Sequence, residues 1–142
     1  MKRKEIFSKG ILIISVLTFI FTASVLAQPA GKVVNKIDDL VGIWESQFQG
    51  GKAYMQYNAD GTLRLATTIE GLKSDVGVAY TGKFWFDGDV YGMTETAGSD
   101  TGTYKVRMQK EGKTTKLSFT PVDEPNSNRE ADITTGMTRV EP

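Results

Sequence analysis

The side chains of this sequence that could do acid–base chemistry are carboxylates, and they are most concentrated at Asp87 and Asp89, on either side of Gly88. Two carboxylates this close could divide the roles of general acid and general base. The segments before and after them, however, alternate apolar and polar residues, and Asp-Gly between two such segments is typical of a tight hairpin turn. We therefore predict a turn at this point and no catalytic pair.

Histidine and cysteine are absent from the 142 residues. Without them the chain has no Ser-His-Asp or Cys-His arrangement and no imidazole or thiolate ligand for a metal ion. An acid or base would have to be a carboxylate, a lysine or a tyrosine, and no such group stands out. We expect a protein that is not an enzyme, with no catalytic residue, no metal site and no cofactor. Its fold cannot rely on disulfides, so packing must stabilise it.

Residues 1–27 have the composition of an export signal. The basic start "MKRKEIFSKG" is followed by an apolar run from Ile11 to Ala27, which ends on the small-residue pattern Val25-Leu26-Ala27. This order is that of a cleaved signal peptide. We expect a mature protein that begins near Gln28 and is periplasmic or secreted. The alternative is an uncleaved membrane anchor, for which the run of 17 residues is at the short limit of a span of about 20.

The remaining 115 residues are enough for one domain with a single core. Residues 1–27 hold four of the 17 basic side chains and one of the 17 acidic ones, so the mature chain has a net charge of −3. A mildly acidic exported domain is poorly suited to nucleic acid, and we expect no such partner. We interpret residues 28–36 as a flexible leader and residues 37–142 as the folded domain.

The domain alternates apolar and polar residues with a period of two, and it has no long stretch of helical period. One helical turn is expected around Ile37 and Leu40. The eight predicted strands are residues 43–48, 53–57, 62–69, 78–86, 89–96, 103–109, 114–120 and 131–140.

Short and long connections alternate between these strands. The connections "NADG", "DG" and "KEG" are tight turns, whereas "QGGK" and residues 70–77, 97–102 and 121–130 are longer. Because alternate loops of a meander lie at opposite ends, one end is closed by short turns and the other is rimmed by long loops. Closure removes the two edges of an open sheet, so we predict an all-β, eight-stranded antiparallel up-and-down barrel. A two-sheet sandwich is the structural alternative.

Closure of this barrel should involve the first and last strands. Gly42 and Trp44 open the first strand, and Arg139 arrives at the same end near the finish of the last one. A planar guanidinium can cover an indole face, which is worth roughly 0.5 to 2 kcal/mol. We therefore predict that Gly42, Trp44 and Arg139 form a structural closure.

The opening "LVGIW", the eight-strand meander and the arginine on the last strand resemble the lipocalin-like branch of the calycin superfamily. The resemblance spans about residues 37–141 and implies a barrel that binds small hydrophobic molecules in its interior. The chain departs from typical lipocalins because it ends without their C-terminal helix and lacks a disulfide. Avidins have a similar opening, but their pocket needs several tryptophans and here only Trp85 accompanies Trp44, so we do not expect biotin binding.

The apolar alternation that starts at Trp44 indicates which side chains point inward. Tyr80 and Tyr104 should offer polar contacts, because a buried hydroxyl needs a partner. The strand at 89–96 is ambiguous, since Tyr91 and Met93 compete with its other residues for the interior. The predicted ligand-binding residues, all toward the long-loop end, are Phe48, Met55, Ile69, Val78, Tyr80, Tyr104, Phe119 and Ile133.

The sequence thus predicts an exported binding protein that holds a small hydrophobic or amphipathic ligand in a barrel interior. The alternative is a filled barrel that acts as a protein-interaction or inhibitor module through its long loops. A protein partner is left open by the sequence, and membrane contact is expected only through residues 1–27 if they are not cleaved.

Overall fold

The computed structural model describes residues 30–141. The expected signal peptide and the expected start at Gln28 lie outside these residues. None of the helices in the described part of the chain is long and apolar enough to cross a membrane.

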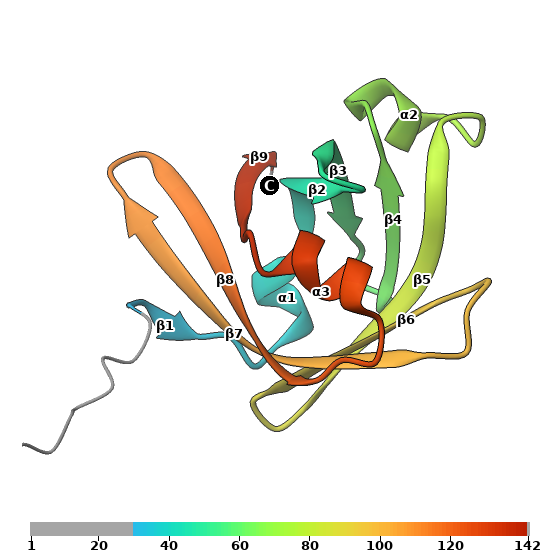
Figure 1. Ribbon diagram of the computed structural model, residues 1–142. Helices are drawn as coiled ribbons and strands as arrows, with labels where there is room; N and C mark the ends of the chain where they lie inside the picture. The colour runs from blue at the N-terminus through green and yellow to red at the C-terminus, as the bar shows by residue number, and fades with distance from the viewer. Residues whose placement is uncertain (1–29, 142) are drawn as a thin grey trace, which may run out of the picture.

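Eight strands of the described chain form one closed antiparallel barrel (Figure 1). Each strand from β2 to β9 pairs with the next, and β9 returns to pair with β2, where Trp44 faces Arg139 in the register. The predicted eight-stranded barrel is therefore confirmed, and the sandwich alternative is wrong. The elements in chain order are β1 (Lys32–Val33), α1 (Ile37–Leu40), β2 (Gly42–Phe48), β3 (Gly51–Tyr57), β4 (Thr62–Ala66), α2 (Ile69–Lys73), β5 (Val78–Asp87), β6 (Val90–Glu95), β7 (Thr101–Glu111), β8 (Thr114–Asp123), α3 (Ser127–Ile133) and β9 (Met137–Glu141).

Asp87 and Asp89 form a turn, as their sequence context predicts. Gly88 between them has φ +61°, a left-handed conformation that glycine adopts without strain. Asp89 accepts a hydrogen bond of 2.6 Å from the Lys105 Nζ on β7. This ion pair lowers the pKa of Asp89 through the hydrogen bond to Lys105. The carboxylates therefore belong to the β5–β6 hairpin and its exposed surface.

The N-terminal segment is ordered against the barrel, which differs from the expected flexible leader. β6 pairs with β7 only from Thr101 to Lys105, so the rest of β7 has a free edge on that side. β1 pairs with this edge, and Val34 continues it by donating its backbone N–H to the Val106 carbonyl at 2.9 Å. The predicted helical turn is present as α1, which places Leu40 in the core. The segment therefore covers the end of the barrel that the tight turns close.

Two of the predicted strands are too long. The strand expected at 62–69 ends at Ala66, because Thr68 caps the helix α2 by accepting a 3.0 Å hydrogen bond from the Gly71 N–H. The strand expected at 131–140 begins only at Met137, after Gly136 at φ +84°. The residues before it form α3, whose N-cap Asn126 accepts a 3.0 Å hydrogen bond from the Arg129 N–H.

The inward face of β6 is settled by burial. Tyr91 and Met93 are fully buried in the core, while Gly92 between them points outward beneath Trp85. A Cβ at Gly92 would collide with the indole of Trp85, so glycine is what lets this partly exposed tryptophan lie flat on the sheet.

Side chains fill the middle of the barrel. Tyr91 has edge-to-face ring contacts with Tyr57 and Phe119, and the Tyr57 and Tyr91 hydroxyls are 3.1 Å apart. Tyr57 packs edge-on against Phe84 with ring centroids 4.8 Å apart. These rings occupy the interior between the two ends, so open space for a ligand has to be sought at the ends.

Candidate functional site

The predicted closure is present at the tight-turn end. The indole of Trp44 is fully buried, and its Nε1 donates a 2.7 Å hydrogen bond to the Leu40 carbonyl. The guanidinium carbon of Arg139 lies 4.3 Å from the centroid of this ring. The Arg139 guanidinium also donates to the Val41 and Asp39 carbonyls, at 3.2 Å each. Trp44 and Arg139 thus make their contacts with each other and with backbone carbonyls of residues 39–41, so they act as a structural closure.

A cavity of about 770 Å³ lies at the opposite end, between α3 and the barrel wall. Figure 1 shows α3 lying across this end of the barrel, where it contacts β2. The floor of the cavity is apolar, while most of its rim consists of polar side chains from the β2–β3 turn, from β6 and from α3. Its lining residues are Ser46, Gln47, Phe48, Gln49, Gly50, Met55, Tyr80, Glu95, Asn126, Asn128, Arg129, Ala131, Asp132 and Ile133.

Half of the predicted ligand-binding residues lie at this cavity. They are Phe48, Met55, Tyr80 and Ile133. Ile133 reaches it from α3, whereas the sequence predicted a strand at this position.

The other four predicted residues lie elsewhere. Tyr104 and Phe119 are buried in the core, and the Tyr104 hydroxyl is already hydrogen-bonded to Glu124. Ile69 stands on α2, because the strand that would have pointed it inward ends at Ala66. Val78 lines a separate groove beside Arg64. The structure therefore places these four residues in the core or at the surface, away from this cavity.

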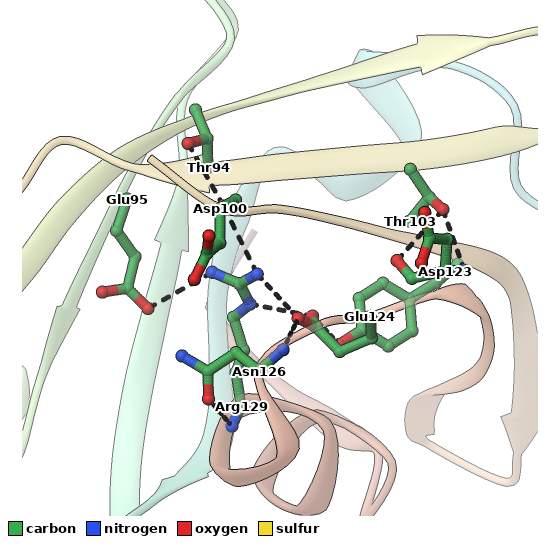
Figure 2. A network of polar contacts seen from close by, with 9 residues as sticks. Thr94, Glu95, Asp100, Thr103, Asp123, Glu124, Asn126 and Arg129 are labelled. Carbon is green, nitrogen blue, oxygen red and sulfur yellow. Dashed lines mark hydrogen bonds and ion pairs between the residues drawn. The ribbon is translucent and has the colours of Figure 1, made fainter. Parts of the chain in front are cut away.

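Arg129 is the centre of a buried polar network beside the cavity (Figure 2). Its Nε and one terminal nitrogen donate to the two carboxylate oxygens of Glu124, at 2.8 and 2.7 Å. Glu95 lies on the other side of the guanidinium, with an N···O distance of 3.6 Å. The side chain of Glu124 is 0% exposed and that of Arg129 is 5% exposed. Such a pair is stable only if its remaining polar atoms find partners.

Those partners are present around Glu124. Tyr104 donates its hydroxyl to one carboxylate oxygen, and the Asn126 N–H donates to the other at 2.8 Å. Burial by itself would raise the pKa of Glu124, but the hydrogen bonds from Arg129, Tyr104 and Asn126 outweigh it and hold this pKa below its ordinary value. The hydrogen bonds to Glu124 likewise raise the pKa of Arg129. Both side chains are therefore charged at neutral pH.

The network also needs a glycine on β7. A Cβ at Gly102 would collide with the Glu124 carboxylate and crowd the Arg129 guanidinium. Only a residue without a side chain lets the backbone of β7 approach the pair this closely.

Asp132 attaches α3 to the β2–β3 turn. Its two carboxylate oxygens accept hydrogen bonds from the backbone N–H groups of Gln49, at 2.9 Å, and Gly50, at 3.2 Å. Gln49 has φ +52°, the one positive φ of a non-glycine residue within residues 30–141. This strained conformation turns both N–H groups toward Asp132. The helix is therefore tied to the barrel on both sides of the cavity.

Tyr80 differs from the other interior tyrosines. The hydroxyls of Tyr57, Tyr91 and Tyr104 all have partners, whereas the Tyr80 hydroxyl makes no hydrogen bond to any residue in the described chain. Burial is the main cause that raises the pKa of Tyr80, with smaller contributions from Tyr57 and Glu95. Tyr80 is thus a neutral, partly buried donor and acceptor at the wall of a cavity.

The polar residues of this site were not predicted from the sequence. Glu95, Arg129 and Asp132 each look like an ordinary surface charge, and only the fold brings them together. One signal was available, because Asn126 followed by Ser127 and Glu130 is a typical start of a helix.

Comparison of the chain with protein-family models, with curated proteins and with solved structures gives no match. What the fold and the site define is an all-β, eight-stranded antiparallel closed barrel with a short helix across one end. This architecture is compatible with a lipocalin-like fold.

Proposed function

We propose that the protein binds a small amphipathic molecule in the cavity between α3 and the barrel wall. The observation that carries the proposal is the unpartnered hydroxyl of Tyr80 at the wall of a cavity of about 770 Å³. This hydroxyl reaches the cavity surface with no protein partner, so it is free to donate a hydrogen bond to a ligand's polar group or to accept one from it. The volume is within the range of roughly 300 to 1,000 Å³ that is usual for small-molecule pockets.

The ligand lies at the mouth of the barrel and not deep within it. Met55 and Ile133 form an apolar floor, and below them the interior is filled by the tyrosine and phenylalanine rings. An apolar segment would pack on this floor, while a polar group would remain at the rim. This division favours an amphipathic ligand and supports a binding role.

A second candidate function is that of a protein-interaction module. The observation that favours it is the exposure of two valines in the segments around the open end, Val76 at 96% and Val122 at 54%. Isolated exposed apolar residues are common on protein surfaces, so this observation is weaker than the cavity.

A neutral fluorescent probe, N-phenyl-1-naphthylamine, tests the proposal. We expect its emission to rise on binding and to fall when a natural lipid extract competes. Ser46→Leu adds bulk to a buried position that lines the cavity, and it should abolish the rise. Ser118→Leu, on the exposed face of β8, is the matched control. A probe signal that is absent, or that is equal in the two variants, would contradict the proposal.

We also propose that the protein is exported, on the basis of the basic, apolar and small-residue order of residues 1–27. N-terminal sequencing of the protein from the periplasm or the medium should give a chain that starts at or near Gln28. A membrane-extracted form that retains Met1 would overturn this proposal.

A further inference from the structure

We infer that the ligand carries a positively charged group, such as an ammonium, which binds between Glu95 and Tyr80 at the rim of the cavity. This inference rests on the proposed function, because it specifies the chemistry of the ligand for the same cavity.

The charges around the cavity do not balance. The charged side chains that line it are Glu95, Arg129 and Asp132, and Glu124 lies directly behind Arg129. Two carboxylates and one guanidinium therefore line the cavity, and that guanidinium is already paired with Glu124. The cavity holds a net negative charge, which attracts a cation and repels an anion.

Glu95 is the carboxylate with spare hydrogen-bonding capacity. The charge of Arg129 is already matched by its two hydrogen bonds to Glu124. The contact of Glu95 with Arg129 is longer, at 3.6 Å, and the Glu95 side chain has no hydrogen bond to another described residue. Both oxygens of Asp132, by contrast, accept backbone N–H groups. Glu95, with 28% of its side chain exposed, is therefore the group that an incoming ammonium would reach.

The aromatic side chains next to Glu95 suit the same ligand. Tyr80 and Phe48 line the cavity and contact each other edge to face, with ring centroids 5.9 Å apart. Aromatic rings stabilise a nearby cation, and the tyrosine hydroxyl can accept a hydrogen bond from an ammonium N–H. Burial, and to a smaller extent Tyr57 and Glu95, raise the pKa of Tyr80, so the hydroxyl stays protonated and neutral.

An anionic ligand does not fit this arrangement. The only cation at the cavity within the described chain, Arg129, is held by two hydrogen bonds to Glu124. A carboxylate or sulfate would have to displace Glu124, which has 0% exposure, or approach the remaining terminal nitrogen of Arg129, which faces Glu95 at 3.6 Å. Either choice places like charges together, which disfavours the anion.

Three amphiphiles with the same ten-carbon tail test the inference by displacing N-phenyl-1-naphthylamine at pH 7. They are decylamine, decanol and decanoate. We expect decylamine to displace the probe at concentrations at least about tenfold lower than decanoate, with decanol between them, because one charge-assisted hydrogen bond is worth about that factor. Raising the ionic strength should reduce the advantage of the amine.

Glu95→Gln should make decylamine and decanol equal when the displacement by each is corrected for the variant's own affinity for the probe. Glu111→Gln, an exposed carboxylate paired with Lys116 at the other end of the barrel, is the matched control and should change nothing. If decanoate binds as well as decylamine, or if Glu95→Gln leaves the preference unchanged, the inference is wrong and the proposed function stands. If neither the probe nor any amphiphile binds, both are wrong.

Discussion

The two ends of this barrel each place an arginine in a partly or fully buried position, but they use it differently. At the tight-turn end, Arg139 covers the Trp44 ring and donates to backbone carbonyls, and it has no carboxylate partner within residues 30–141. At the open end, Arg129 is held between two carboxylates, Glu124 and Glu95.

This difference suggests that the tight-turn end stabilises the fold, whereas the open end suits the proposed binding of a ligand. The contacts of Trp44 and Arg139 are all made within the protein, which suits an end that only closes the barrel. At the open end the pair of Glu124 and Arg129 is satisfied, but Glu95 and Tyr80 keep hydrogen-bonding capacity that faces a cavity. The proposed ligand site therefore lies at the end where polar groups with spare hydrogen-bonding capacity line a cavity.

Removal of the indole at the closed end should have the largest effect on stability. We expect Trp44→Ala to lower the free energy of unfolding by roughly 3 to 5 kcal/mol, because it leaves a cavity in the core. This is a large share of the 5 to 15 kcal/mol or so that stabilises a typical domain, so the variant should unfold or aggregate. Chemical denaturation checks this, with Trp85→Phe as the control. Equal midpoints for the two variants would contradict the assignment.

Removal of the guanidinium at the open end should come next. Arg129→Ala leaves Glu124 buried without its partner, and we expect a loss of about 3 kcal/mol in the free energy of unfolding. The double variant Glu124→Leu/Arg129→Met removes both charges and should recover most of this loss. Urea denaturation of the three proteins measures it, and a double variant less stable than Arg129→Ala would show that the charges themselves stabilise the fold.

The same pair predicts a pH dependence. The folded-state pKa of Glu124 is lower than its ordinary value of 4.5, so its stabilising contribution is fully present above that pH and is lost as the pH falls through the folded pKa. Glu124→Gln should therefore be less stable than the parent at pH 7, and the difference should shrink toward pH 2. Urea midpoints across this range test it. A difference that is constant with pH would exclude an ionised Glu124 as the cause.

A methyl group on β7 should have a smaller effect at the same network. Gly102→Ala pushes against the Glu124 carboxylate, and we expect a loss of about 1 to 3 kcal/mol. Gly98→Ala is the matched control, because a Cβ there would be in ordinary contact, 3.7 Å from the Glu95 Cβ. Thermal unfolding of both variants checks the prediction, which fails if Gly102→Ala is as stable as the control.

The smallest effect on stability is expected when the planar guanidinium of Arg139 is replaced by an ammonium. Arg139→Lys keeps the charge but loses the planar contact with Trp44, so we expect a measurable destabilisation of roughly 0.5 to 2 kcal/mol. Arg139→Ala also removes the aliphatic cover of the ring and should lie between Arg139→Lys and Trp44→Ala. The readouts are the denaturation midpoint and the emission of Trp44 in a Trp85→Phe background. If Arg139→Ala changes neither, the contact does not close the barrel.

The closed end could be predicted from the sequence because the residue patterns that specify it are local or lie in the first and last strands. Apolar alternation marks the strands, glycine and aspartate mark the turns, and the position of Trp44 requires a cover from the last strand. Each of these patterns can be interpreted without knowledge of the fold.

The open end could be predicted only in its apolar half. Alternation identified Phe48, Met55 and Tyr80, but α3 is only seven residues long, too short to show a clear helical period. Its charged residues resemble ordinary surface charges, since the burial of Arg129 depends on Glu124 and on the close approach of Gly102. β1 was missed for a similar reason, because the free edge of β7 exists only after the barrel has formed.

An NMR titration with decylamine tests most directly whether the open end binds and the closed end only stabilises. In ¹H–¹⁵N spectra of the protein, we expect saturable shifts of the amides of Phe48, Tyr80, Glu95 and Ile133. The indole signals of Trp44, at the closed end, and Trp85, on the outer surface, should not move. Shifts centred on Trp44, or a spectrum without saturable changes at the open end, would contradict this division between the two ends.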